Sequence, residues 1–291
     1  MKNKIHTIPS LLLALICFSS ISARAASVEG DALVWWGFEG ALTGTNDIDL
    51  TGVSTSTAGL SPTVAFNYEN ITGLNAANAG SQAVVYDGTN ALKTNDPSLR
   101  LGGAQTFWMR VNLSSIPSGS VALMTRSRAL NGSRGIALQI SNGRLVGYVS
   151  SDGQTYEAQL YSGTSYLLQE DVWYDISMRF DPSNVLRIDL YDPMTGGLLD
   201  TLETTSNIPA SISTSNSIGS GYFQVGSINN GSSGSTWSVP DGTQVDGAGV
   251  WDSYLSDSDV AQLSEIPEAK SGAIILGLLV LAMVTGRRVR R

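Results

Sequence analysis

Apolar side chains occupy every second position in several short stretches of this chain. They do so from residue 174 to 180, and Leu186, Ile188 and Leu190 repeat the pattern a few residues later. A period of two puts these side chains on one face of a β-strand, whereas a helix would need a period near 3.6. The chain is therefore predicted to fold mainly into half-buried strands.

A hairpin is predicted around Asn142-Gly143, which separates the alternating stretches 136–140 and 145–149. Asn and Gly tolerate a positive φ angle, and a type I′ turn needs one at both central positions. The two strands should therefore pair in antiparallel fashion.

Turns rich in Gly, Asn and Asp separate about a dozen such strands, a pattern typical of an all-β, two-sheet antiparallel sandwich. One helix is expected from Ser256 to Glu265, because Ser256 can cap it and Asp259 stands at the third helical position. No internal repeat or linker divides residues 26 to 266, so one domain is expected. The remaining predicted strands are 32–38, 82–87, 105–112, 121–126, 155–161, 198–203, 222–227 and 246–252.

Charge is distributed unevenly. Eight of the 17 basic residues lie in the two terminal segments, but 24 of the 25 acidic residues lie between them, which leaves residues 26 to 266 near −15. Phosphate recognition needs a clustered basic surface, so we do not expect this chain to bind nucleic acid. Charged residues make up only 14% of the chain, against an average of about 25%. This composition suits an extracellular domain.

Residues 1–25 have the pattern of a secretory signal peptide. Lys2 and Lys4 precede an apolar run, and Ala23 and Ala25 provide the small side chains of a cleavage site. The run is too short for a membrane span, which needs about 20 residues. Cys17 raises the alternative of a lipoprotein, although the preceding Ile16 is larger than such a signal prefers.

The only His and the only Cys of the chain, His6 and Cys17, lie in this leader. The processed chain would contain neither an imidazole base nor a thiol. Ser-His, Cys-His and zinc-hydrolase mechanisms are therefore excluded.

The C-terminal segment 267–291 has three parts. Pro267-Glu268-Ala269 comes first, an apolar stretch at about 271–286 follows, and Arg287, Arg288, Arg290 and Arg291 mark the basic end at 287–291. This arrangement resembles the PEP-CTERM sorting signal of bacterial surface proteins, which implies processing by an exosortase, although Ala269 replaces the second Pro of the motif. A transmembrane anchor that is never cleaved is the alternative, with its basic end in the cytoplasm.

Several motifs between the two ends follow one another in an order that resembles a laminin-G-like, concanavalin A-like jelly roll. The resemblance covers about residues 26 to 266 and implies a two-sheet sandwich that binds carbohydrate or protein, often with calcium. Some relatives are glycoside hydrolases or polysaccharide lyases. The motifs are Ala83-Val84-Val85-Tyr86-Asp87-Gly88, Gln105-Thr106-Phe107-Trp108-Met109-Arg110, Asp171-Val172-Trp173-Tyr174-Asp175-Ile176, Leu186-Arg187-Ile188-Asp189-Leu190-Tyr191 and Val245-Asp246-Gly247-Ala248-Gly249-Val250-Trp251.

Catalysis is not expected. A retaining glycosidase needs two carboxyl groups about 5 Å apart on one face. The closest strand, 187–192, contains no Glu, and its Asp189 and Asp192 point to opposite faces. The lyases of this fold commonly use His, which is absent after residue 6.

Two aromatic residues are candidates for ligand binding, Trp237 and Tyr156. Trp237 follows the polar loop 229–236, where an exposed indole can stack on a sugar ring or instead fold back over the end of the sandwich. Tyr156 lies in the predicted strand 155–161. Four other tryptophans occupy strand patterns and are expected in the core: Trp36, Trp108, Trp173 and Trp251.

Asp87, Asp241 and Asp246 are candidate calcium ligands, because carboxylates at loop ends suit this hard cation. Each can alternatively be a turn or capping residue. The sequence thus predicts an exported bacterial protein of the cell surface, envelope or extracellular matrix that adheres to glycan without catalysis. A purely structural matrix component and a polysaccharide-degrading enzyme are the alternatives.

Overall fold

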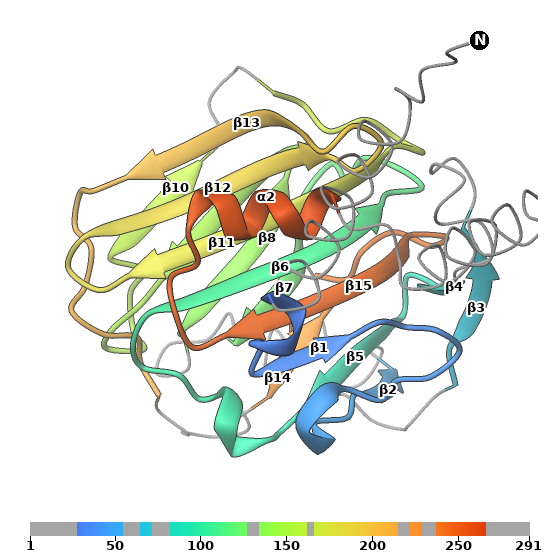
Figure 1. The fold of residues 1–291 in the computed structure, drawn as a ribbon, viewed down its shortest axis with the longest axis horizontal. Coiled ribbons are helices and arrows are strands. Elements are labelled where there is room, and N and C mark those ends of the chain that lie inside the picture. Colours follow the sequence, from blue (N-terminus) through green and yellow to red (C-terminus); the bar gives the residue numbers. More distant parts are fainter. Residues whose placement is uncertain are drawn as a thin grey trace, which may run out of the picture.

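A computed structural model of the chain describes residues 28–54, 65–71, 82–126, 134–161, 166–214, 222–228 and 237–265. These residues form two antiparallel β-sheets packed face to face, the jelly-roll sandwich that the sequence predicts (Figure 1). The predicted leader 1–25, with Ala23 and Ala25, and the segment 267–291 lie outside the described residues. No helix within the described part of the chain is long and apolar enough to span a membrane.

Sheet A has eight strands. Their order is β13 (Gly197–Thr204), β12 (Val185–Asp192), β11 (Trp173–Asp181), β6 (Gln105–Asn112), β15 (Gln244–Trp251), β4 (Gln82–Val85) and β3 (Asn67–Asn70), with β1 (Val34–Trp36) paired to β15. Every neighbouring pair is antiparallel.

Sheet B has seven strands. Their order is β10 (Ala158–Tyr161), β9 (Arg144–Val149), β8 (Ile136–Ser141), β7 (Ser120–Arg126), β14 (Phe223–Val225), β5 (Asn90–Thr94) and β2 (Thr51–Ser54). The helical elements include α2 (Asp257–Glu265) and the short 3-10 helices η1 (Thr45–Asp47) and η3 (Pro97–Leu99).

The alternating stretches build the core between the sheets. Ile176 pairs with Met109 and Met178 with Phe107, so that apolar side chains of β11 and β6 share the inner face of sheet A. The strands β2, β3 and β5 were not predicted, because they offer few apolar residues to reveal a period. In β5, for example, only Ala91 and Leu92 are apolar.

The predicted hairpin is confirmed. Ser141 pairs with Arg144, and Asn142 and Gly143 have φ angles of 51° and 74°. Both central residues thus have the positive φ of a type I′ turn.

The predicted helix is confirmed as α2, which lies on the outer face of sheet A (Figure 1). The Asp259 amide donates to Ser256 Oγ at 3.2 Å, and the Ser256 amide donates to Asp259 Oδ2 at 3.2 Å. This reciprocal cap fixes the start of the helix. Val260 and Leu263 then face the sheet and are buried.

The four tryptophans expected in the core are all buried, but they do not share one core. Trp36 lies between the sheets, whereas Trp108 and Trp251 form a second cluster on the outer face of sheet A with Leu263 of α2. Trp173 packs in a third, small cluster. The central strands of sheet A are therefore covered on both faces.

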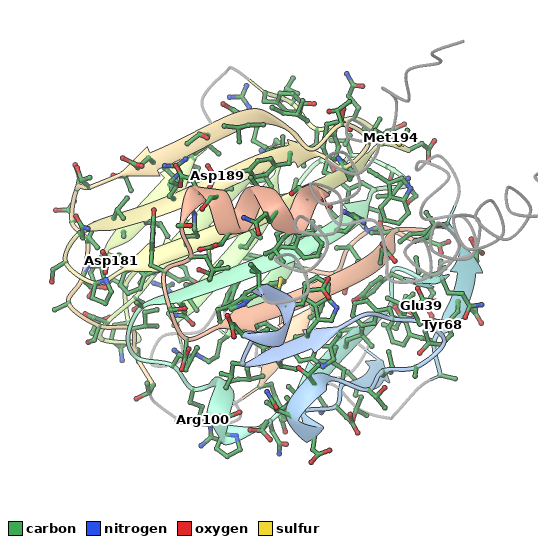
Figure 2. The ribbon with its side chains drawn as sticks, viewed as in Figure 1. Glu39, Tyr68, Arg100, Asp181, Asp189 and Met194 are labelled. Carbon is green, nitrogen blue, oxygen red and sulfur yellow. The ribbon has the colours of Figure 1, made fainter. Side chains whose placement is uncertain are left out.

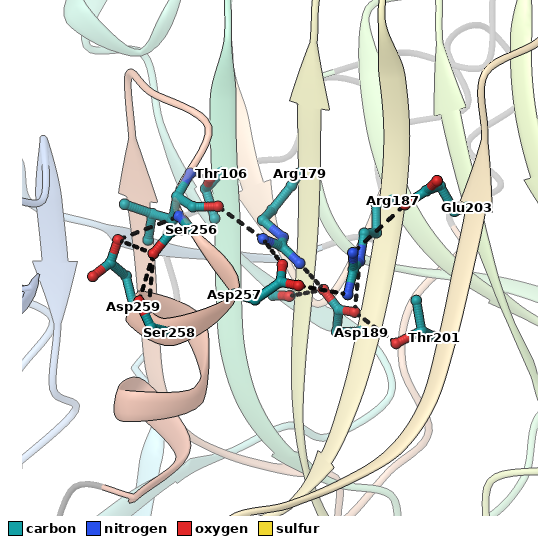
Figure 3. A network of polar contacts seen from close by, with 12 residues as sticks. Thr106, Arg179, Arg187, Asp189, Thr201, Glu203, Ser256, Asp257, Ser258 and Asp259 are labelled. Carbon is teal, nitrogen blue, oxygen red and sulfur yellow. Dashed lines mark hydrogen bonds and ion pairs between the residues drawn. The ribbon is translucent and has the colours of Figure 1, made fainter.

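Charged residues are also buried on this outer face (Figure 3). The Arg179 guanidinium contacts Asp189 at 2.5 Å and Asp257 of α2 at 2.7 Å. Arg187 donates to the second oxygen of Asp189 at 2.9 Å. Both Arg179 and Asp189 have no exposed side-chain surface, and Figure 2 places Asp189 beside α2. The ion pairs thus hold α2 against β11 and β12.

We expect Arg179→Ala to lower the free energy of unfolding by about 3 kcal/mol, because Asp189 would stay buried with part of its charge uncompensated. Urea unfolding of the whole chain in mild detergent measures this loss. Glu203→Gln is the control: Glu203 is 47% exposed and lies 3.5 Å from Arg187. Its substitution should change stability by no more than about 0.5 kcal/mol. Equal effects of the two variants would contradict the role given to Arg179.

Candidate functional site

Three tyrosines gather on the outer face of sheet B, where β9 and β10 form its margin. Leu145 and Val149 of β9 point into the core, which leaves Tyr148 on the outer face. Ala158 and Leu160 of β10 point inward in the same way and leave Tyr161 outside. Tyr156, just before β10, joins them.

Tyr156, which the sequence predicted to bind ligand, contacts other side chains through its ring. Its ring stacks on Tyr148 with 4.7 Å between centroids and 30° between planes. The Arg134 guanidinium lies 5.1 Å over the same ring. One face cannot hold both groups, so both faces of Tyr156 are covered. A sugar ring therefore has no free face of Tyr156 on which to stack.

Tyr161 is the exposed member, with 56% of its surface accessible. Its ring stands perpendicular to Tyr148 at 5.8 Å. The Tyr148 hydroxyl donates to the Tyr161 hydroxyl at 3.2 Å, which in turn donates to Gln159 Oε1 at 2.9 Å. Burial and this bond to Tyr161 raise the pKa of Tyr148, which keeps it neutral. Tyr161 is thus both accessible and held in place.

Tyr161 was not identified from the sequence, although a signal for it exists. The tetrapeptide Ala158–Tyr161 alternates small or apolar residues with Gln159 and Tyr161. A Tyr in the polar phase of a strand has to face solvent or a ligand. The prediction of a strand at 155–161 is confirmed by β10, but the sequence analysis did not say which of its side chains face solvent.

Outward-facing residues of β8 and β14 in the same sheet are not accessible to solvent. Ala137 of β8 is fully buried, and Gln139 of β8 and Gln224 of β14 are each only 2% exposed, although all three alternate with core residues. Only the β9–β10 margin therefore offers an accessible aromatic surface on these strands.

Trp237 is half-buried. Its carbonyl accepts from the Ala122 amide at 3.1 Å, and its own amide donates to the Ile228 carbonyl at 3.3 Å. The loop 229–236 lies outside the described residues. Ligand binding by Trp237 and the alternative of a lid both stay predictions.

Two of the three candidate calcium ligands lie in neighbouring turns. Asp87 is exposed and accepts from the Thr89 amide at 2.8 Å and the Thr89 hydroxyl at 3.0 Å. Asp241 is also exposed, and a Cβ atom placed on Gly88 would lie 3.2 Å from its amide nitrogen. Both are turn residues in this structure. No group of three potential ligands of the His, Cys, Asp and Glu types able to hold a metal occurs among the described residues.

Asp246 lies apart from them, in the bulge of β15 opposite β6. It is 4% exposed, and its Oδ2 lies 3.5 Å from Arg110 Nη1. Arg110 donates from Nε and Nη2 to Asp175 at 2.7 and 2.9 Å. Burial, with the nearby charges of Asp175 and Glu39, raises the pKa of Asp246 to about 7, against the opposing effect of Arg110. The structure therefore pairs Asp246 with a guanidinium, and the predicted trio of calcium ligands is not assembled.

The contribution of Asp246 to stability should fall as pH rises from about 4 to about 7. The folded pKa of Asp246 is about 7, above an unfolded value of about 3.9, so the folded state binds the proton more tightly in this window. Asp246→Asn should then raise the free energy of unfolding at pH 8 by roughly 1 to 3 kcal/mol and leave it unchanged at pH 4. Urea unfolding at the two pH values measures this, and an equal effect at both would contradict it.

A pair of facing carboxylates is not found at the small depression that residues of β9, β12 and β13 line. Asp200 is the one acid in its lining, which consists of Leu145, Tyr166, Leu168, Leu190, Asp200 and Leu202. Asp189, considered above for catalysis, is engaged by Arg179 and Arg187 instead. The described residues provide no glycosidase-type acid pair at these places.

No family model and no curated protein matches the sequence. Solved structures are similar in fold. Domain 4 of AbnA, a GH43 extracellular arabinanase from Geobacillus stearothermophilus in complex with arabinotriose, matches with a TM-score of 0.57 and 12% identity, over 81% of this chain and 98% of that domain.

Two toxin domains are similar as well. The binding domain of Paraclostridial Mosquitocidal Protein 1 matches with a TM-score of 0.54 and 11% identity over 81% of this chain. The binding domain of botulinum neurotoxin DC, in complex with rat synaptotagmin II, matches with a TM-score of 0.52 and 10% identity over 83% of this chain. This chain spans about half of each toxin domain, 52% and 53%. At such identities the likeness establishes the sandwich fold alone.

Proposed function

We propose that this protein is a non-catalytic carbohydrate-binding domain, exported and displayed on a bacterial surface or in its extracellular matrix. The observation that carries the proposal is the braced tyrosine cluster, in which Tyr161 is 56% exposed and hydrogen-bonded through its hydroxyl. A fixed, accessible ring stacks on the apolar face of a sugar without losing much conformational entropy.

Hydrogen bonding around Tyr161 suits a polyhydroxylated ligand. Gln159 is exposed on the same strand, and its amide already donates to the Tyr156 carbonyl at 3.0 Å. Sugars are recognised by such combinations of an apolar ring and a few oriented polar groups. That the arabinanase domain of the same fold was solved with arabinotriose supports a saccharide as the ligand class.

Export and display rest on the two ends of the sequence. The leader 1–25 would direct secretion, and the segment 267–291 would act as the sorting signal, with the apolar stretch in the membrane until an exosortase-like enzyme processes it. A structural matrix component is the second candidate. A chain with few charged residues and a net negative charge also suits a structural layer without a specific ligand. Binding is favoured over it by the ordered aromatic margin that β9 and β10 form among the described residues.

We expect Tyr161→Ala to reduce retardation of the whole chain in native gels that contain the bound polysaccharide. Loss of a stacked ring should weaken binding by about 5- to 30-fold. Tyr161→Phe keeps the ring and should retain most of the binding. Leu198→Ala, at a 52% exposed position of β13, is the control and should bind as the native chain does.

Gels with a panel of polysaccharides, run with calcium and again with a chelator, identify the ligand and the role of the ion. If no polysaccharide retards the native chain, the binding proposal is wrong and the structural role stands. If the chelator removes retardation, Asp87→Asn and Asp241→Asn become the variants to test for a calcium ligand.

A further inference from the structure

Arg126, the last residue of β7, is a buried arginine without an acidic partner. Its exposed fraction is 5%. The other buried arginines in the described part of the chain, Arg110 and Arg179, both form ion pairs with aspartates. No ion pair joins Arg126 to an acid that the structure describes. A buried charge without a counter-charge is costly, so this position calls for an anion.

The acid that Arg126 lacks is not hidden in the neighbouring loops. The segments 127–133 and 215–221 lie outside the described residues, and neither contains Asp or Glu. Of the 25 acidic residues of the chain, only Glu268 lies outside the described residues. The positive charge of Arg126 is therefore not neutralised by the acids of the folded domain.

Hydrogen bonds hold the Arg126 guanidinium in place but leave donors free. Its Nη2 donates to the Leu101 carbonyl at 3.0 Å and to the Ser213 carbonyl at 2.8 Å. Its Nε is buried and has no hydrogen-bond partner among the described residues. An arginine has five N–H donors, of which these bonds use two. The group is thus fixed between two distant segments and can donate further hydrogen bonds.

A second arginine, Arg100, lies close to Arg126. It precedes Leu101, whose carbonyl Arg126 binds. Burial first, and then the charge of Arg100, lower the pKa of Arg126 to about 10, so that Arg126 stays charged at neutral pH. Arg100 is half-buried at the margin of the molecule (Figure 2), and its Nε also has no partner within the described structure. Two like charges therefore face one another here.

Asp96 is the acid that senses Arg100, but it does not neutralise the pair. It accepts from the Ser98 amide at 2.9 Å and from the Ser98 hydroxyl at 2.6 Å. These hydrogen bonds lower the pKa of Asp96 most, and the charge of Arg100 has a smaller effect. Asp96 is not among the groups that shift the pKa of Arg126. Positive charge thus remains in excess at Arg126.

This pair of arginines lies next to the tyrosine cluster of sheet B. A Cβ atom placed on Gly135 would lie 3.5 Å from Arg126 Nη2 and would clash with the Arg126 carbonyl oxygen. The preceding residue, Arg134, reaches over the Tyr156 ring. Two consecutive residues, Arg134 and Gly135, therefore connect the Tyr156 side of the cluster to Arg126.

We propose that Arg126 and Arg100 bind an oxyanion, and that this anion is a carboxylate or sulfate group of an acidic polysaccharide. The planar N–H fork of arginine matches such groups and forms strong, charge-assisted hydrogen bonds with them. The inference rests on the proposed function, because it names the class of saccharide that this domain binds. Two arginines suit one anionic group and do not form the extended basic surface that nucleic acid needs.

Native gels of the whole chain in mild detergent test the proposal, with dextran, dextran sulfate or polygalacturonate in the gel. Dextran and dextran sulfate share one sugar backbone, so their comparison isolates the sulfate groups. We expect dextran sulfate or polygalacturonate to bind the native chain at least about 5-fold more tightly than dextran does. The chain has a net charge of −8, so a general attraction to polyanions does not explain such retardation.

Substitutions identify the residues that carry the effect. Arg126→Gln and Arg100→Gln should each weaken binding of the charged polymer by about 5- to 50-fold, because each removes charge-assisted hydrogen bonds. Arg144→Gln is the matched control and should bind as the native chain does. It removes the same charge at the turn of the β8–β9 hairpin, whereas Arg126 pairs with Ile136 at the other end of β8.

Urea unfolding checks that each variant folds. If Arg126→Gln does not fold, the half-buried Arg100 keeps the test decisive, and Arg126→Lys should fold but bind more weakly, since it keeps the charge without the planar fork. Equal retardation by dextran and the charged polymers, no retardation by either charged polymer, or retardation that survives Arg100→Gln would overturn the proposal.

A free inorganic anion is distinguished by a separate arm. Thermal unfolding is followed in sodium sulfate and in sodium chloride of equal ionic strength, for the native chain and for Arg100→Gln. If sulfate stabilises only the native chain and no charged polymer retards it, the site binds a free ion and the polysaccharide assignment is wrong.

Failure of this inference can be told apart from failure of the proposed tyrosine site. If Tyr161→Ala loses binding of a polysaccharide but Arg126→Gln and Arg100→Gln keep it, only the present inference fails. If Arg100→Gln loses binding of the charged polymer but Tyr161→Ala keeps it, the arginine site stands and the role given to Tyr161 is wrong.

Discussion

Burial of both faces of the central strands of sheet A is the constraint on which the rest of this structure depends. Its inner face meets sheet B, and its outer face carries Trp108, Trp251 and the fully buried Arg179 and Asp189. Neither large indoles nor charges are stable there unless they are covered and paired. Helix α2 provides the cover, and Asp257 links it to the sheet.

The outer faces of the two sheets differ in what they contact. Sheet A uses its outer face to hold chain segments that come from both ends of the domain, 28–30 and α2. Sheet B leaves one margin open, at β9 and β10, where Tyr161 is accessible. A binding surface on sheet B would therefore be supported by a sandwich whose opposite side is already closed.

Part of this arrangement was predicted from local patterns. The alternation in 174–180, the Asn142-Gly143 turn and the Ser256 cap each depend on neighbours within a few residues, and each is confirmed. The strands β2, β3 and β5 were missed because they contain few apolar residues to reveal a period of two. Asp246 was misjudged for a different reason, since no local pattern indicates that Arg110 lies opposite it.

The sequence by itself determined the class of fold, because strand period and turn residues are local properties, and its composition showed that no His or Cys follows residue 17. Only the tertiary structure decided which aromatic ring is free. Tyr148, Tyr156 and Tyr161 are indistinguishable as residue types, but Arg134 and Tyr148 cover the two faces of Tyr156 and leave Tyr161 exposed. Side-chain accessibility depends on contacts between segments distant in sequence, which a local pattern does not contain.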